Sequence, residues 1–306
     1  MHMDDYSYLL KCPGAIGVLN GGIYTFSGIG MADGIDSSLF EIGSLTKLFT
    51  GDIISELIDS REINIDDSLA SYLDLPQRHK WPTLRDVLTH HAGYEKDYFE
   101  WIPVYKCKLG IDKIIEYRES IMRQRLIKEN SLRCSGQYKY SNFGYAIIGM
   151  VASRVYGWPY SHVLEQHLKK NGYKHTGINI ASDPDYWEWN LQDTYIAAGG
   201  LCSNVFDMLH FAKSVMSRYC DGKVSILTNL QSVITDGRQD DISGVGMSIL
   251  IRFNETRIHT GCTARCNSYI SFNPNTQQAL AVFLKAPKEQ CDASYIGSQL
   301  EKSVYY

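Results

Sequence analysis

The pattern of apolar and polar residues along the chain predicts strands at its two ends and helices between them. Residues 14–19 and 23–29 form two short β-like runs, and Asn20-Gly21-Gly22 between them predicts a hairpin, because Asn and Gly tolerate positive φ. Near the other end, apolar residues alternate over 245–253, as in one half-buried strand. Further strands are expected over 256–261, 267–272 and 277–284.

Apolar residues at helical spacing predict the helices, the first of which begins at Ser44. The expected helices are 44–59, 83–90, 112–128, 143–156, 159–170, 204–217 and 288–303. Residue types that accept a hydrogen bond from a backbone N–H mark their starts: Thr83, Ser203 and, for a short helix after the first, Asp66 or Asp67. Small residues at 197–200 predict a tight junction where backbones approach closely.

This order of elements predicts an α/β (α+β) fold, with an antiparallel sheet built from both chain ends and flanked by helices. A mainly helical subdomain is inserted between the two sheet-forming parts. We expect the sheet subdomain over 1–60 and 190–306, the helical subdomain over 61–189, and the active-site cleft between them. A chain of 306 residues is long enough to bury the core that this arrangement needs.

Composition and charge narrow the classes of partner. The formal net charge is −4, which gives no basic field for nucleic acid, and no polybasic run suggests a membrane surface. The acidic start, Met1-His2-Met3-Asp4-Asp5, does not resemble a signal peptide, so we expect a cytoplasmic protein unless a leader was trimmed. The expected partner is a small-molecule or peptide substrate, and the oligomeric state is left open.

No metal or other cofactor is expected from the cysteines and histidines. The eight cysteines include no Cys-x-x-Cys pair, and free thiols are favoured over disulfides. Cys262 and Cys266 are expected to share one strand face. His90, His91, His162 and His167 lack complementary ligands at metal spacing and are interpreted as structural.

Ser44 and Lys47 form the first candidate catalytic pair. A spacing of three residues places both on one face of a helix, where an amine can reach a hydroxyl. The helix N-terminus also offers backbone N–H groups to a negatively charged oxygen. Taken alone, the same residues also fit a helix-capping serine followed by a solvated lysine. Ser44 is, however, the only serine in the chain with a lysine three residues later.

Two further motifs follow in order along the chain. Tyr140-Ser141-Asn142 stands at the entrance of the apolar helix 143–156, where Asn142 is also a possible N-cap. His259-Thr260-Gly261 ends one expected strand and precedes another. His175-Thr176-Gly177 has the same three residues, but it follows a helix and has no strand before it. We therefore assign the third motif to 259–261.

The ordered set Ser44-x-x-Lys47, Tyr140-Ser141-Asn142 and His259-Thr260-Gly261 resembles the serine β-lactamase and penicillin-binding-protein superfamily. The Tyr-x-Asn motif points to its class C β-lactamase, D,D-peptidase and esterase-like branch, over about residues 14–285. The resemblance implies that Ser44 is the nucleophile and that Lys47 with Tyr140 moves its proton. It also implies that Asn142 binds substrate or holds Lys47, and that the N–H groups of Ser44 and Cys262 form the oxyanion hole, beside His259, Thr260 and Gly261.

Two residues depart from the family pattern. His259 replaces a lysine of the β-lactamases, which weakens that activity and favours peptidases and esterases. Imidazole titration would then give the pH profile an acid or neutral limb. Arg265 stands where the family usually has glycine, so it is expected to narrow the cleft rim or bind an anionic group.

The expected function is that of a serine hydrolase forming an acyl-enzyme on Ser44 with a small amide or ester, such as a D-amino-acid peptide or a carboxyl ester. One alternative is an acyltransferase or cyclase of secondary metabolism that uses the same acyl-enzyme. A second is a non-catalytic binding protein on the same fold. Substrate specificity is expected to lie in the loops 94–107 and 181–196.

Overall fold

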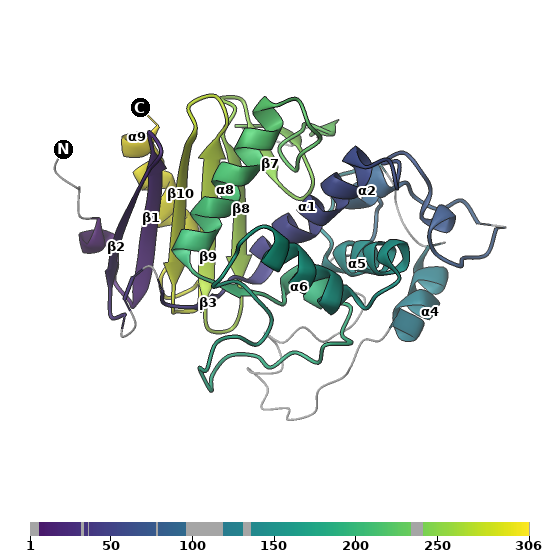
Figure 1. Cartoon of the computed structure of the whole chain (residues 1–306), viewed down its shortest axis with the longest axis horizontal. Helices are drawn as coiled ribbons and strands as arrows, with labels where there is room; N and C mark the ends of the chain where they lie inside the picture. Colours follow the sequence, from purple (N-terminus) through teal and green to yellow (C-terminus); the bar gives the residue numbers. More distant parts are fainter. Residues whose placement is uncertain are drawn as a thin grey trace.

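The computed structural model describes residues 6–31, 34–35, 37–77, 79–95, 119–130, 136–233 and 241–305. Figure 1 shows a twisted sheet on one side of the molecule and a group of helices on the other. The main sheet has eight strands in the order β2-β1-β10-β9-β8-β7-β6-β5, and each neighbouring pair is antiparallel. The predicted fold class, an antiparallel sheet flanked by helices, is confirmed.

The two ends of the chain meet at the centre of one half of this sheet. β1 (Gly14–Asn20) turns into β2 (Ile23–Ile29) through Gly21 and Gly22, whose φ values of 56° and 79° explain why glycine stands there. β1 also pairs with β10 (Gln278–Leu284), which pairs with β9 (Asn267–Asn273). The predicted hairpin and the joining of both termini in one sheet are therefore confirmed.

β8 (Arg257–Cys262) is paired along its whole length on one side only. Its first residues pair with β7 (Leu250–Arg252), at Arg257 and Ile258, whereas all six pair with β9. Within the described chain, no strand lies against the outer edge of β8 from His259 to Cys262. This edge therefore presents backbone groups beside the cavity described below.

The prediction of one strand over 245–253 is wrong. The segment contains the end of β6 (Ile242–Val245) and all of β7, which pair with each other around a turn. Ser248 has a φ of 64°, and a Cβ on Gly246 would lie 2.1 Å from the Ile226 carbonyl oxygen. Met247 and Ile249 are fully buried although they lie in the turn. The alternation of apolar residues therefore reflects burial of side chains and not an extended backbone. β5 (Gln231–Ser232) completes this side of the sheet.

Helices cover both faces of the sheet. α8 (Val205–Cys220) packs on β1 and β10 from one face, and α9 (Ala293–Val304) packs on β9 and β10 from the other (Figure 1). The cap of α8 is Asn204, whose side chain accepts from the Asp207 N–H at 2.8 Å. The prediction of Ser203 is wrong, because that residue lies in β4 (Cys202–Ser203), which pairs with β3 (Phe40–Glu41).

The helical group surrounds α1 (Thr46–Asp59), which the 3₁₀ turn η2 (Gly43–Leu45) precedes. α1 contacts α5 (Asn142–Tyr156), α6 (Tyr160–Lys170) and α7 (Ile196–Gly199). α2 (Leu84–Leu88) begins at the predicted cap, Thr83. The described part of the predicted helix 112–128 is α4 (Glu119–Glu129), and its earlier residues lie outside the described chain.

The short turn η3 (Leu69–Ser71) is capped by Ser68, not by Asp66 or Asp67 as predicted. Asp66 instead pairs with Arg85, at 2.7 Å between the Oδ1 and Nε atoms. Among the described residues, no helix combines the length and the apolar character that crossing a bilayer requires.

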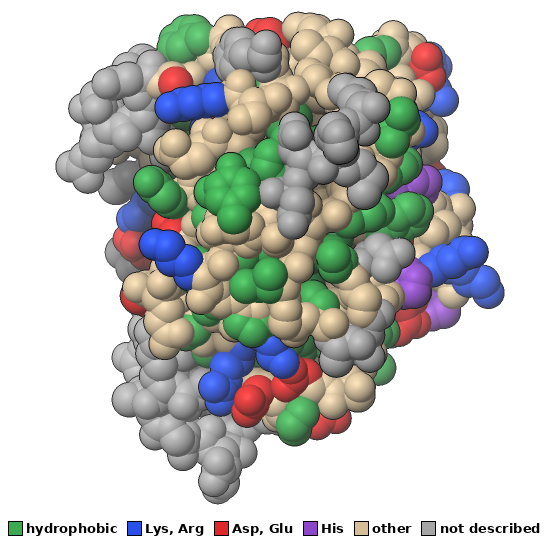
Figure 2. Space-filling model, turned by 90° about the vertical axis from the view of Figure 1, so that its left-hand side faces the viewer, with side chains coloured by type: hydrophobic (Ala, Val, Ile, Leu, Met, Phe, Trp, Pro, Cys, Tyr) green, Lys and Arg blue, Asp and Glu red, His purple; other side chains and the backbone are tan. Residues whose placement is uncertain are grey.

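Figure 2 looks onto the side of the molecule near β2, where acidic and basic side chains are interspersed with polar and apolar ones. The exposed apolar side chains of this end of the fold include Tyr8 of η1 (Ser7–Leu9) and Ile23 and Ile29 of β2. The described part of this face thus carries charges of both signs rather than a field of one sign.

Candidate active site

Two glycines allow the turn that carries Ser44 to touch β8. Gly43 has a φ of 50°, and a Cβ there would lie 2.8 Å from the backbone nitrogen of Cys262. A Cβ on Gly261 would lie 2.0 Å from the Ile42 carbonyl oxygen. Both contacts are too close for any side chain. The backbone nitrogen of Cys262 is therefore placed directly beside the turn that presents Ser44.

Lys47 points at Ser44 from the first turn of α1. Its Nζ lies 3.1 Å from Ser44 Oγ and donates to the Ala198 carbonyl oxygen at 2.6 Å. The Lys47 side chain is fully buried, and Ser44 is half-buried. The alternative of a solvated lysine behind a capping serine is therefore wrong. No residue pattern predicted the contact of Lys47 with the Ala198 carbonyl oxygen.

The predicted junction at 197–200 forms α7 and holds that carbonyl in place. Thr50 of α1 donates to the Ala197 carbonyl at 2.7 Å, and its hydroxyl lies 2.7 Å from the Tyr160 hydroxyl. The Leu201 N–H donates to the Thr46 hydroxyl at 3.2 Å. These bonds tie α7 to the same helix that carries Lys47.

Tyr140 is brought to the other side of Lys47. Lys47 Nζ lies 5.0 Å from the centre of the Tyr140 ring, and the Tyr140 and His259 rings are 6.3 Å apart between centres. The ring of His90 packs against Tyr140, with 4.5 Å between centres. The three motifs that are far apart in the sequence thus meet around Ser44.

His90 is a residue whose place at this site the sequence did not predict. Its Nδ1 accepts from the Ser141 N–H at 3.1 Å, so its proton is on Nε2, which lies 3.3 Å from Ser248 Oγ. Burial, and the nearby charge of Lys47, hold the pKa of His90 well below its ordinary value. A neutral His90 therefore supports the ring and the backbone around Tyr140. Its only sequence signal was its position beside His91.

His259 links β8 to the turn that carries Ser44. Its Nε2 lies 3.0 Å from the Ser44 carbonyl oxygen, which can only accept, so the ring donates. Burial, with the charge of Lys47, lowers the pKa of His259 to about 3, although the bond to Ser44 works in the opposite direction. Of the two limbs expected from imidazole titration, acid or neutral, this lowered pKa of His259 favours the acid one.

A cavity of about 360 Å³ opens over these residues. Its lining includes Ser44, Tyr138, Tyr140, His259, Thr260, Gly261 and Cys262, and on the far side Lys288, Asp292 and Ser294. Thr260 and Cys262 are exposed. The cavity is thus lined by β8, by its neighbours β7 and β9, and by the Ser44 turn.

Asn142 is half-buried at the start of α5 and is not among the residues that line this cavity. It is also not the N-cap: the Ser141 hydroxyl accepts from the Gly144 N–H at 2.9 Å. The capping interpretation of Asn142 is therefore wrong.

The second His-Thr-Gly segment lies elsewhere and has a structural role. The His175 N–H and the Thr176 hydroxyl donate to Asp207 Oδ2 at 2.7 and 2.9 Å, at the start of α8. Gly177 forms a backbone bridge with Cys202. Assigning the third motif to 259–261 therefore agrees with the geometry of the cavity.

Arg265 is half-exposed in the turn after β8. Its Nη2 lies 3.3 Å from Asp185 Oδ1, an exposed ion pair that joins this turn to the loop 181–196. Cys262 ends β8 and is exposed, whereas Cys266 is buried in the following turn, so the prediction that they share a strand face is wrong. The described cysteines are free thiols, and Cys107 and Cys134 lie outside the described residues.

One group in the described chain has the residue types of a metal site: Asp52, Glu56 and His167. The prediction that His167 lacks complementary ligands is therefore wrong. Asp52 and Glu56 lie on α1 and His167 on α6, so their proximity depends on the tertiary fold. The group is considered separately below.

Comparison with known proteins identifies this architecture. The family model described as Beta-lactamase matches residues 14–297. Among solved structures, a penicillin-binding protein homologue from Pyrococcus abyssi, described as octameric, superimposes with a TM-score of 0.75 at 19% identity, covering 96% of this chain and 74% of that one. A β-lactamase/D-alanine carboxypeptidase from Yersinia pestis gives 0.74 at 17% identity, covering 96% and 94%.

Curated relatives are similarly distant in sequence. A probable fimbrial assembly protein, FimD, of Dichelobacter nodosus is 24% identical over 56% of this chain and 48% of its own length. A putative penicillin-binding protein, PbpX, of Bacillus subtilis is 26% identical over 87% and 68%. A teichoic acid D-alanine hydrolase of Staphylococcus aureus is 25% identical over 56% and 44%. The chain spans about half the length of several curated relatives that it matches.

Proposed function

Because the chain belongs to the Beta-lactamase family, a family with serine hydrolases among its members, we propose that it is itself a serine hydrolase that forms an acyl-enzyme on Ser44. The observation that carries this proposal is the 3.1 Å contact between Nζ of the fully buried Lys47 and Oγ of the half-buried Ser44. Lys47 is placed to take the serine proton once it has lost its own.

The reaction proceeds in two acyl transfers. Ser44 Oγ attacks the carbonyl carbon of an amide or ester while its proton passes to Lys47. The tetrahedral intermediate then loses an amine or alcohol, which takes up that proton, and leaves the acyl group on Ser44. Water next attacks the acyl carbonyl carbon and gives a proton to the same base. The bond from that carbon to Ser44 Oγ then breaks, Ser44 takes the proton back from the base, and the carboxylic acid is released. Tyr140 shares this proton transfer, and its position 5.0 Å from Lys47 Nζ, measured to the ring centre, supports that role.

The oxyanion of each intermediate is held by the backbone N–H groups of Ser44 and Cys262. The close approach of Gly43 to the Cys262 nitrogen supports this pairing. His259, Thr260 and Gly261 form the wall that binds substrate. Asn142, at the start of α5, binds substrate or holds Lys47. The cleft runs between the sheet part, 1–60 and 190–306, and the helical part, 61–189.

The substrate is a small amide or ester, such as a peptide that contains a D-residue or a carboxyl ester. Relatives described as a D-alanine hydrolase and a D-alanine carboxypeptidase support the D-amino-acid class. A neutral His259 supplies less positive field to a substrate carboxylate than a lysine would, which disfavours an efficient β-lactamase.

Two alternatives remain distinguishable by experiment. An acyltransferase or cyclase would use the same acyl-enzyme but pass the acyl group to an amine or alcohol instead of water. Product analysis with added nucleophiles separates it from a hydrolase. A non-catalytic binding protein would keep the fold and show no turnover of any ester or amide.

The direct test is labelling with a fluorescent penicillin or a fluorophosphonate, followed by mass spectrometry. We expect one adduct on the peptide that contains Ser44, abolished by Ser44→Ala and unchanged by Ser298→Ala, a serine on the exposed side of α9. Turnover of p-nitrophenyl esters and D-amino-acid amides then defines the substrate class. No adduct and no turnover between about pH 5 and pH 9 would refute the hydrolase proposal.

A further inference from the structure

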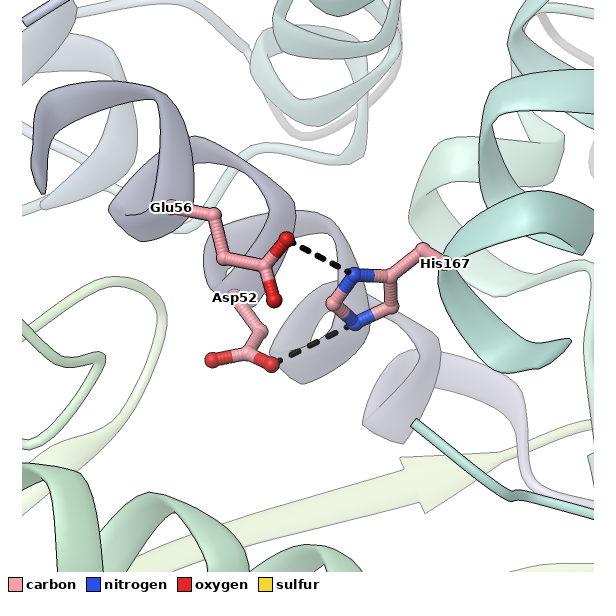
Figure 3. Close-up of side chains that lie close together, drawn as sticks. All are labelled: Asp52, Glu56 and His167. Atoms are coloured by element: carbon pink, nitrogen blue, oxygen red, sulfur yellow. Dashed lines mark ion pairs between the residues drawn. The ribbon is translucent and has the colours of Figure 1, made fainter. Parts of the chain in front are cut away.

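A buried polar cluster joins α1 to α6 and α8, away from the residues that line the cavity. Figure 3 shows the imidazole of His167 between the carboxylates of Asp52 and Glu56. His167 Nε2 lies 3.3 Å from Asp52 Oδ2, and Nδ1 lies 3.7 Å from Glu56 Oε2. The Asp52 side chain is fully buried, and that of His167 is only 4% exposed. Each ring nitrogen therefore faces a different carboxylate.

The charges of this cluster do not balance while His167 is neutral. The mostly buried groups are Asp52, Glu56 and Arg218, whose Nη2 contacts Asp52 Oδ1 and whose Nη1 lies 3.9 Å from Glu56 Oε1. Two carboxylates and one guanidinium leave one negative charge uncompensated. Lys170 pairs with Glu56 at 2.9 Å but is 68% exposed, so water largely screens its charge. One further buried positive charge would neutralise the cluster.

A divalent cation fits this deficit less well than a proton does. The three residues have suitable ligand atoms within 4.8 Å of one another. A cation of charge two would, however, leave the buried cluster with a net positive charge beside Arg218. It would also have to draw both carboxylates to one ring nitrogen, whereas the two lie on opposite nitrogens of His167.

We propose that His167 is a proton-binding site, at which the imidazole takes up a proton between Asp52 and Glu56 and the resulting cation fastens α1 to α6. A protonated ring can donate from both nitrogens at once, one to each carboxylate. Burial by itself lowers the pKa of His167, but the hydrogen bonds and charges of Asp52 and Glu56 outweigh it and raise this pKa. In return, His167 and Lys170 outweigh burial and hold the pKa of Glu56 at about 2.

The other groups around the ring come from each packed element. The Asn171 amide, just after α6, lies 3.4 Å from Nδ1 and 3.5 Å from Glu56 Oε1. Tyr173 lies near Asp52 and Arg218, and Tyr156, at the end of α5, lies near Glu56. The neutral amide is the competitor that matters, since it can donate to Nδ1 of an unprotonated ring and so favour the neutral form.

The ion pairs of protonated His167 stabilise the packing of α1, the helix that carries Lys47. α6 already holds the first half of α1 through the bond between Thr50 and Tyr160. The His167 cluster holds α1 further along, at Asp52 and Glu56, which are two and six residues after Thr50. Loss of the proton therefore loosens α1 from α6 at one end while the Thr50 contact remains.

The test is direct and independent of catalysis. In the full chain, the ring resonances of His167, assigned by comparison with His167→Gln, are followed by NMR against pH. We expect a titration above 6.5, the ordinary value for this side chain. Glu56→Gln should move the titration to lower pH, because it removes one of the two carboxylates. A neutral ring at pH 6, as the Asn171 contact would favour, refutes the proposal.

Stability gives a second readout. The folded chain holds the proton more tightly than the unfolded one, so the effect is present below pH 6.5 and is lost as pH rises through the pKa of His167. As pH rises from below 6.5 to above the folded pKa of His167, the equilibrium constant for unfolding should rise. The rise should be about tenfold for each unit by which the folded pKa exceeds the unfolded one. His167→Gln should lose this dependence and His162→Gln, on the same helix, should keep it. Equal pH dependence in wild type and His167→Gln, or stabilisation by Zn²⁺ that His167→Gln abolishes, would overturn the proposal in favour of a passive or metal-binding cluster.

Discussion

His259 Nε2 donates a hydrogen bond to the backbone carbonyl of Ser44 across 3.0 Å, so a ring on β8 fixes the turn that presents the nucleophile. The bond needs only a neutral imidazole. Burial lowers the pKa of His259 to about 3, so the ring is neutral at higher pH. His259 thus acts by position rather than by charge at neutral pH. Several consequences can be measured.

The first concerns stability in acid. The folded pKa of His259, about 3, lies below the ordinary value of 6.5, so between these pH values the unfolded chain binds more protons. The free energy of unfolding therefore falls as pH falls through this window, by up to roughly 5 kcal/mol from this group. Denaturant unfolding of wild type and His259→Gln should diverge below about pH 6, and parallel curves would contradict the assignment. Between about pH 5 and pH 8, the dependence of the reaction rate on pH should have the same shape in wild type and His259→Gln.

Replacement of the buried lysine should remove chemistry and keep the fold. Lys47→Met fills a similar volume with an apolar chain and takes away the amine that lies 3.1 Å from Ser44 Oγ. We expect acylation to slow by about 10²–10⁴-fold, the usual worth of a positioned base. Stopped-flow ester acylation measures the rate, and thermal unfolding checks the fold. Wild-type acylation in a folded Lys47→Met variant would exclude Lys47 as the base.

A methyl group at Gly43 should separate the nucleophile turn from β8. Its Cβ would lie 2.8 Å from the Cys262 nitrogen, at a φ of 50°. Gly222→Ala is the matched control, since Gly222 also has positive φ but nothing within 4 Å of the added carbon. Both variants carry backbone strain of about 1 kcal/mol, so only Gly43→Ala should lose further stability and most activity. Equal effects on stability and activity would show that the contact with Cys262 is unimportant.

Ser141 and Asn142 should separate into a structural and a functional residue. Ser141→Ala removes the cap of α5, with its bonds to the Gly144 N–H and the Glu95 carbonyl, and should cost about 1 kcal/mol. Asn142→Ala should lower stability less, because Asn142 is not the cap. It should lower activity more, because Asn142 is proposed to bind substrate or to hold Lys47. Urea unfolding and kcat/KM together test this. The opposite ranking would return the capping role to Asn142.

Local patterns predicted the elements on which the site is built. Asn20-Gly21-Gly22 marked the hairpin because its backbone needs positive φ, and the apolar spacing after Ser44 marked α1. The capping residues were harder to choose. Ser203 and Asn204 both have capping side chains and stand side by side, and only the pairing of β4 with β3 decides between them.

Contacts between distant segments were beyond the reach of sequence patterns. Asp52 and Glu56 meet His167 only because α1 and α6 pack together, and residues more than a hundred positions apart leave no local signal. The same holds for Lys47 and the Ala198 carbonyl, since a backbone oxygen has no residue type to recognise. The ordered motifs predicted residues that the fold brings close together, but not the groups that hold them in place.

The outer edge of β8 gives the cavity a directional wall. Between His259 and Cys262, backbone N–H and C=O groups alternate along the edge that β7 leaves unpaired, so an extended amide chain can lie against it as one more antiparallel or parallel strand. An ester of the same acyl group has fewer groups to match this ladder. We therefore expect lengthening a substrate by one peptide unit on the side along β8 to lower KM, and an unchanged KM would show that the edge is not used. A lower KM for the longer substrate would make the sheet itself part of the binding surface, with substrate selection depending on how closely a ligand imitates a strand.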